Sequence, residues 1–206
     1  MATLAGVHSR FHMTTIPNLR RESLAGGHVK GAMVRAHLQF VRDRLGDAGV
    51  TRTLGALPAP VLAEVQGILP STWCSFESLV LLDRAIARAA GREERELMRE
   101  LGRYSAQINL STVYRAFNRD DIHEFFRLSA TLHRQFQDFG TCEYQHLGEG
   151  RGRISVRNAI CFSPAYCDSE VGYLEQVITT HGGTPIVSES ACQCSGDDHC
   201  TFELRW

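Results

Sequence analysis

The sequence predicts an α+β fold, in which a helical N-terminal half packs on a four-stranded antiparallel sheet. Up to about residue 140, apolar residues recur with the helical period of about 3.6 residues. After Gly140 the period changes to about 2, which is typical of half-buried strands. The remaining residues, 140–206, read strand, strand, helix, strand, strand. A chain of 206 residues is long enough to bury the core that this arrangement needs.

Local stop and start signals divide the N-terminal half into helices. Gly46 follows an apolar stripe that begins at Met33, so we expect the first helix to end there. Pro58 opens the second helix and Pro70 closes it. Asp120 and Asp121 supply an N-cap and early negative charge for the last one. The predicted helices span residues 30–46, 58–69, 73–90, 93–108, 111–118 and 121–138.

Two hairpins and one helix are predicted in the C-terminal half. Residues 141–147 and 153–161 form the first pair of strands, joined by a glycine-rich turn at 148–152. Pro164 opens a helix that Gly182 ends. Residues 184–193 and 199–206 form the second hairpin, since apolar and polar residues alternate cleanly in its last strand.

The chain is therefore expected to hold one domain. Residues 1–27 lack periodicity and are predicted to be an N-terminal tail, with a short strand near 13–16. Residues 28–206 form the domain, with a helical part at 28–139 and the strand-rich module at 140–206.

Charge and composition exclude several classes of function. The net charge of −1 gives no bias toward nucleic acid or anionic membranes. There is no run of about 18 apolar residues and no secretory signal. Seven cysteines, an odd number, do not suggest a secreted disulfide scaffold, so we expect a cytoplasmic protein. Lys30 is the only lysine among the 22 basic residues, which is typical of a GC-rich bacterial genome.

Five of the seven cysteines fall between positions 161 and 200. Cys192 and Cys200 flank the turn of the second hairpin, where paired strands place opposite residues about 5 Å apart. Cys167 lies in the first turn of the preceding helix, on the face that should meet the sheet. Glu189 can add a carboxylate oxygen. These four side chains predict a closed, tetrahedral zinc site of the structural kind.

This ligand set makes one demand on the backbone. Glu189 and Cys192 have opposite parity along a strand, so a bulge near Ser190–Ala191, or a strand end there, is required. Cys194 has the same parity as Cys192 and competes for its role. Two other interpretations stay open: the cysteines are small buried apolar residues, or Cys192 and Cys194 form a redox switch.

The segment 189–202 resembles the C-terminal signature of the 4-vinyl-reductase domain, which runs Glu, Cys, a Gly-Asp turn, Cys and an aromatic residue. The same domain forms the sensor of phenol-responsive transcription activators. Those sensors hold zinc with a Cys, then Glu-x-x-Cys, then a Cys eight residues later. Glu189, Cys192 and Cys200 match this spacing, and Cys167 matches the first ligand to within about one residue. The start at 30–36 and the terminal Trp206 resemble an uncharacterised family of myxobacterial paralogues.

The resemblance implies a fold shared with TRAPP vesicle-tethering subunits and with the haem–nitric-oxide-binding superfamily. It implies a non-enzymatic sensor or adaptor with structural zinc, which binds a small apolar ligand or a partner protein, and a homodimer. The alternatives are a TRAPP-like scaffold without a ligand and an enzyme of the tetrapyrrole vinyl reductase type.

Neither an enzyme nor a haem protein has clear support in the sequence. No residues are predicted to be catalytic, since nucleophile-elbow, zincin and Walker motifs are missing. The Tyr-x-Ser-x-Arg element of the haem-binding relatives is also missing. His123, His133 and His146 remain candidates for lining a pocket.

Overall fold

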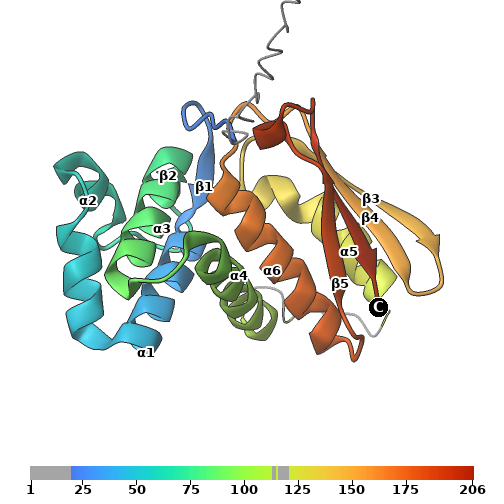
Figure 1. The fold of residues 1–206 in the computed structure, drawn as a ribbon, viewed down its shortest axis with the longest axis horizontal. Coiled ribbons are helices and arrows are strands. Elements are labelled where there is room, and N and C mark those ends of the chain that lie inside the picture. The colour runs from blue at the N-terminus through green and yellow to red at the C-terminus, as the bar shows by residue number, and fades with distance from the viewer. Residues whose placement is uncertain (1–19, 113–114, 116–120) are drawn as a thin grey trace, which may run out of the picture.

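The structure is a computed structural model that describes residues 20–112, 115 and 121–206 (Figure 1). The predicted strand at 13–16 and most of the predicted helix at 111–118 lie outside these residues. The element order confirms the predicted α+β fold: five helices precede a four-stranded sheet, and a sixth helix lies between its two hairpins.

The helical half contains α1 (Gly31–Gly55), α2 (Ala59–Val65), α3 (Phe76–Ala90), α4 (Glu94–Ser111) and α5 (Ile122–Phe136). Side-chain caps start three of them. In α3, the Ser75 side chain accepts a hydrogen bond from Ser78 N. In α4, the Glu93 side chain accepts one from Glu96 N, and in α5 the Asp121 side chain accepts one from His123 N. The cap predicted at Asp121 is thus confirmed.

Two of the predicted helix boundaries were wrong: the second helix ends at Val65 and not at residue 69, and the third begins later than predicted. The predicted break at Gly46 is confirmed, with φ 66° and ψ −175°, but a helical segment that was not predicted follows at once and continues to Gly55. Trp73–Ser75, predicted as the start of a helix, is the strand β2. It pairs antiparallel with β1 (His28–Lys30), a strand that was not predicted. Each strand has only three residues, too few to show the alternation of apolar and polar residues by which a strand is predicted from sequence.

The sheet contains β3 (Thr141–Gly148), β4 (Arg151–Arg157), β5 (Ile186–Ala191) and β6 (Cys200–Arg205), in the order β3-β4-β6-β5, and all pairs are antiparallel. Helix α6 (Pro164–Thr180) connects β4 to β5. Strand β4 ends at Arg157, short of the predicted residue 161, because Asn158 adopts a left-handed φ of 56°.

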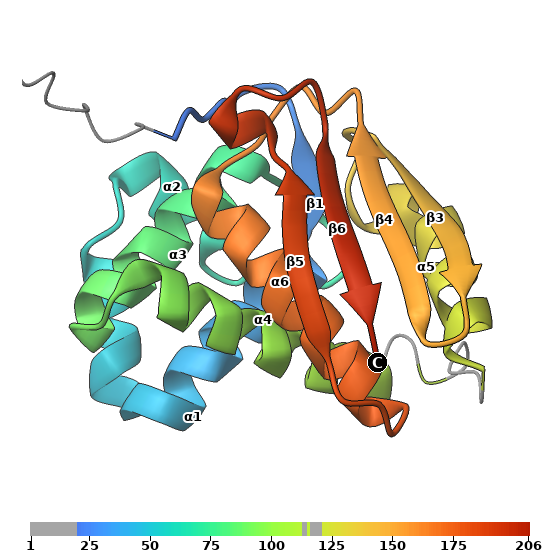
Figure 2. The same ribbon diagram turned by 45° about the vertical axis from the view of Figure 1, so that its right-hand side comes forward.

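One face of the sheet is covered by α5 and α6 (Figure 2). Helix α6 also packs along α4, and so it joins the sheet to the helical half (Figure 1). This packing forms two hydrophobic clusters. One lies among α1 to α4, and the other lies between the sheet and helices α5 and α6.

Within the described ranges, none of the helices is both long enough and apolar enough to cross a membrane.

Candidate metal centre and internal cavity

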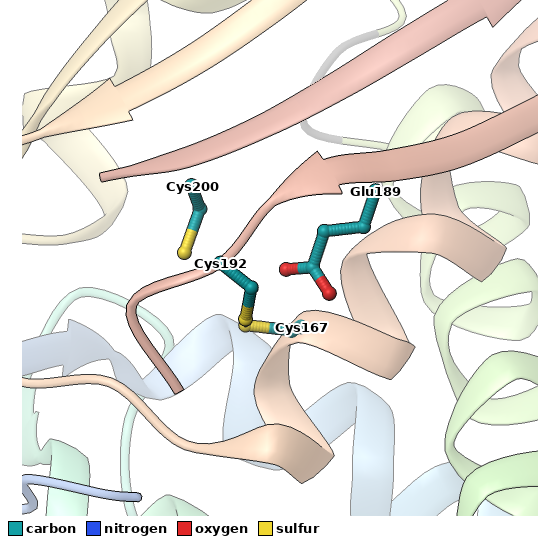
Figure 3. Close-up of side chains that lie close together, drawn as sticks. All are labelled: Cys167, Glu189, Cys192 and Cys200. Atoms are coloured by element: carbon teal, nitrogen blue, oxygen red, sulfur yellow. The ribbon is translucent and has the colours of Figure 1, made fainter. Parts of the chain in front are cut away.

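The fold brings together the four side chains that the sequence singled out as ligands (Figure 3). Cys167 comes from the first turn of α6, and Glu189 from near the end of β5. Cys192 directly follows β5, and Cys200 is the first residue of β6. One ligand atom from each residue lies within 4.8 Å of the other three. The arrangement can hold a metal ion.

The local backbone explains how four residues so far apart in the chain converge. The register between β5 and β6 shifts between Glu189 and Ala191, which is the irregularity that the ligand parity required. After the strand ends, Asp197 Oδ2 accepts a hydrogen bond from Cys192 N at 2.7 Å. This bond holds the chain in a tight turn over the 3₁₀ segment Gln193–Ser195. Glu189 and Cys192 therefore point to the same side.

The sulfur atoms lie at metal-site spacing and not at disulfide spacing. Cys167 Sγ and Cys192 Sγ are 3.9 Å apart. Two sulfurs on one tetrahedral zinc, each with a Zn–S bond of about 2.3 Å, lie about 3.8 Å apart. A disulfide bond would need about 2.05 Å, and every cysteine in the described residues is free.

Arg20 contacts the cluster, and the sequence interpretation missed it. Its Nη2 donates to Glu189 Oε2 at 3.0 Å and to Cys192 Sγ at 3.5 Å, and its Nη1 donates to Asp168 Oδ2 at 3.4 Å. The neighbouring Arg21 donates its backbone N–H to Cys194 O at 2.7 Å. Both arginines belong to the predicted tail, where they read as solvated charges. The chain from residue 20 onward instead lies against the cluster.

The electrostatics of the cluster favour a cation. Burial, followed by the neighbouring Cys192 thiolate, raises the pKa of Glu189 to about 8. Hydrogen bonds from Cys167, Cys194 and Cys200 hold the pKa of Cys192 far below its usual range. Glu189 Oε1 is buried and has no hydrogen-bond partner among the described residues. A buried carboxylate oxygen without a donor is costly, and an ion between it and the sulfurs would satisfy it.

Cys194 remains close to the site. Its Sγ lies 4.0 Å from Cys167 Sγ, and it is buried within the 3₁₀ segment. It does not belong to the set of four whose ligand atoms all lie within 4.8 Å of one another. The geometry therefore favours Cys192 as the ligand, as the sequence spacing did, and places Cys194 directly beside the cluster.

A cavity of about 120 Å³, partly open to the surface, lies where the two hydrophobic clusters meet. Two smaller cavities adjoin it, since Tyr166 and Glu170 line all three. One of these, of about 50 Å³, is also lined by Cys167 and Cys200. The cavities thus extend from the helical half to the back of the cysteine cluster.

Of the three histidines considered as pocket residues, His133 lines this cavity system. Its Nε2 lies 3.1 Å from Phe139 O, and its Nδ1 lies 2.7 Å from Gln137 Nε2. Burial lowers its pKa. His123 and His146 instead stack on each other, with ring centroids 3.7 Å apart.

Neither protein-family models nor curated protein sequences match this chain. Solved structures do. An H-NOX protein from S. oneidensis in the Fe(II)NO ligation state superposes with a TM-score of 0.68 and 13% identity, over 85% of this chain and 98% of that one. An unliganded Fe(II) H-NOX mutant from K. algicida gives a TM-score of 0.68 at 11% identity, over 85% and 95% of the two chains. At such low identity the likeness shows the fold alone. The chain has an H-NOX-like fold, one of those that the 4-vinyl-reductase resemblance implied.

Proposed function

We propose that this chain is a non-enzymatic sensor domain of the 4-vinyl-reductase type, which binds a small, largely apolar molecule and is stabilised by one zinc ion. The ion is held by Cys167, Glu189, Cys192 and Cys200. The observation that carries the proposal is the convergence of these four ligand atoms beside a cavity that reaches the same cysteines.

The ligand atoms fit zinc better than other common ions. Three sulfurs and one oxygen at tetrahedral spacing suit zinc, whereas calcium and magnesium prefer oxygen ligands only. Gln193 N donates to Cys200 Sγ at 3.5 Å, a contact that favours the thiolate form. Three thiolates and a carboxylate carry more negative charge than one Zn²⁺ neutralises. The Arg20 guanidinium offsets part of the remainder.

We place the role of the zinc in the structure of the domain. All four protein ligands come from α6 and the second hairpin, so the ion would fix this hairpin to the helix that lines the cavity. With four protein ligands no position is open for a reacting water, which favours a structural site over a catalytic one.

The residues around the cavity do not fit a haem. The solved relatives are H-NOX proteins, and some of their structures are described in terms of haem distortion. In this chain both ring nitrogens of His133 already have partners, so the one histidine of α5 that faces the cavity is not free to bind iron. Glu170 also adds a carboxyl group to the cavity lining. We therefore propose an organic ligand without iron.

The cavity also favours a sensor over a TRAPP-like scaffold, because a pure scaffold has no need for unfilled space in its core. A cytoplasmic homodimer that passes its signal to a partner protein completes the proposal. No observation among the residues that the structure describes favours the tetrapyrrole vinyl reductase alternative.

Elemental analysis of protein purified without added metal tests the zinc site. We expect one zinc per wild-type chain and none in Cys200→Ser. The matched control is Cys74→Ser, a buried cysteine of the other hydrophobic cluster, and it should keep the ion. Wild type without metal would overturn the site.

A screen of apolar compounds tests the ligand site. A compound that binds the native state should raise the melting temperature of the protein, because binding stabilises that state. A protein that no compound stabilises would favour the scaffold.

A further inference from the structure

Glu170 is a carboxylic acid in a largely apolar part of the core. It lies on the second turn of α6 and lines all three cavities. Nothing in the described part of the chain hydrogen-bonds or ion-pairs with its carboxyl group. The side chain is half-buried beside the cavity, and burial of the carboxyl group raises its pKa to about 7. A carboxylate placed this way lacks a positive partner.

The residues around Glu170 do not supply a positively charged partner for its carboxylate. Among the residues that the structure describes, neither a lysine nor an arginine lines the three cavities. The titratable groups that line them with Glu170 are His37, His133, Cys142, Cys161, Tyr166, Cys167, Tyr173 and Cys200. His133 is held neutral, with both ring nitrogens engaged. Burial, followed by the nearby carboxyl group of Glu170, raises the pKa of Cys142 to about 12.

Most of the cavity lining is apolar or aromatic. Phe125 and Phe126 line it from α5, Ile154 from β4, and Leu174 and Val177 from α6. Close to Glu170, Asn109 and Tyr173 add one amide and one hydroxyl, which interact with each other. Further polar side chains line the cavity, among them Ser129, His133 and Gln137. Among the described lining residues Glu170 carries the one carboxyl group, so the cavity has one acidic pole and a largely apolar body. Its volume is comparable to that of an engineered cavity of about 150 Å³ that takes up benzene.

We propose that the ligand of this domain is a small organic amine, whose protonated nitrogen pairs with Glu170 and whose single ring or short apolar chain fills the space beside Phe125 and Phe126. This inference rests on the proposed sensor function and names its ligand class. The ammonium group supplies the missing positive partner, and the phenylalanine faces favour a nearby cation. A phenol or a hydrocarbon would leave the carboxyl group unpaired.

Three probes of the same shape but different polarity test this inference: benzylamine, benzyl alcohol and toluene. Binding to the wild-type, zinc-loaded protein is measured by calorimetry at pH 8, where Glu170 is ionised. We expect benzylamine to bind at least about tenfold more tightly than benzyl alcohol, since a charge-assisted contact replaces a neutral one. In Glu170→Gln this preference should disappear, while toluene binding is retained. Glu175→Gln changes a carboxylate of the same helix that pairs with Arg103, and it should keep the preference.

The outcomes separate the two proposals. If toluene and benzyl alcohol bind as well as benzylamine, or if Glu170→Gln keeps the preference for the amine, the amine inference is wrong and the sensor function stands. If none of the three compounds binds to the wild type, the cavity is not a site for a one-ring ligand and both proposals fail. The comparison among probes needs no variant, so a folding defect in Glu170→Gln cannot hide the answer.

Discussion

Gly102 of α4 and Gly172 of α6 lie in a reciprocal contact at which the two helix backbones touch. A Cβ atom on Gly102 would lie 1.9 Å from Ser169 O, and one on Gly172 would lie 2.0 Å from Arg99 O. The two contacts are equivalent: each glycine faces the backbone carbonyl group of the residue that lies three positions before the other glycine in the sequence. No larger residue fits at either position without separating the helices. The contact sets how closely α6, which carries Cys167 and Glu170, approaches the helical half.

The first prediction follows from this contact. Gly172→Ala should lower the free energy of unfolding by about 3 kcal/mol, because the added methyl group meets backbone that cannot move by a rotamer change. Gly55→Ala is the control, since a Cβ there has no atom within 4 Å, and it should change the stability by less than about 0.5 kcal/mol. Urea denaturation measures both. Equal stabilities would show that the helices are not in close contact.

The second prediction concerns the choice between Cys192 and Cys194. Cys192→Ser should lose the metal, because the thiolate that links Cys167 to Glu189 is gone. Cys194→Ser should keep one metal per chain, with at most a modest fall in affinity. Metal content by elemental analysis, together with cobalt substitution and its thiolate-to-metal absorption, reports on both. Loss of the ion in Cys194→Ser and its retention in Cys192→Ser would reverse the assignment.

The third prediction concerns Arg20. Arg20→Gln removes the charge that faces Glu189 and Cys192, so the affinity for zinc should fall about tenfold, as is typical when a group that orients metal ligands is lost. Competition with a chromophoric chelator measures the affinity. Arg21→Gln is the matched control. Its contact with the cluster is a backbone hydrogen bond to Cys194 O, which the substitution leaves in place, so its affinity should equal that of wild type.

Much of this fold could be predicted from hydrophobic periodicity. The change of period at Gly140 located the boundary between the helical half and the sheet, because side chains alternate faces in a strand and recur every turn in a helix. The misses are of two kinds. The strands at 28–30 and 73–75 are too short to carry a period. The helix that resumes after Gly46 shows that a left-handed glycine marks a kink as well as a stop.

The four residues that the structure brings together were singled out from the sequence, but their surroundings were not. Residue spacing singled out Glu189 and Cys192, and their opposite parity demanded the bulge between them. Arg20 is 169 residues from Glu189 along the chain, and no local pattern links the two. Glu170 lies three residues after Cys167 and four before Leu174, and so on the apolar side of α6, where a carboxylic acid is unexpected. Its place in a cavity depends on the packing of α4, α5 and β4, which the sequence does not display.

The last prediction is that Glu170 lowers the stability of the empty domain in a pH-dependent way. The pKa of Glu170 is raised from 4.5 to about 7 in the folded chain. Between these values the folded state holds a proton that the unfolded state has lost, so stability falls as the pH rises through this window and stays low above it. Glu170→Gln removes this loss. Without ligand, the variant should therefore gain stability over wild type at pH 8 and gain little at pH 5. Urea denaturation at both pH values measures the difference. An equal effect at both would mean that Glu170 is already paired in the folded chain, and the acidic pole that an amine would occupy would not exist.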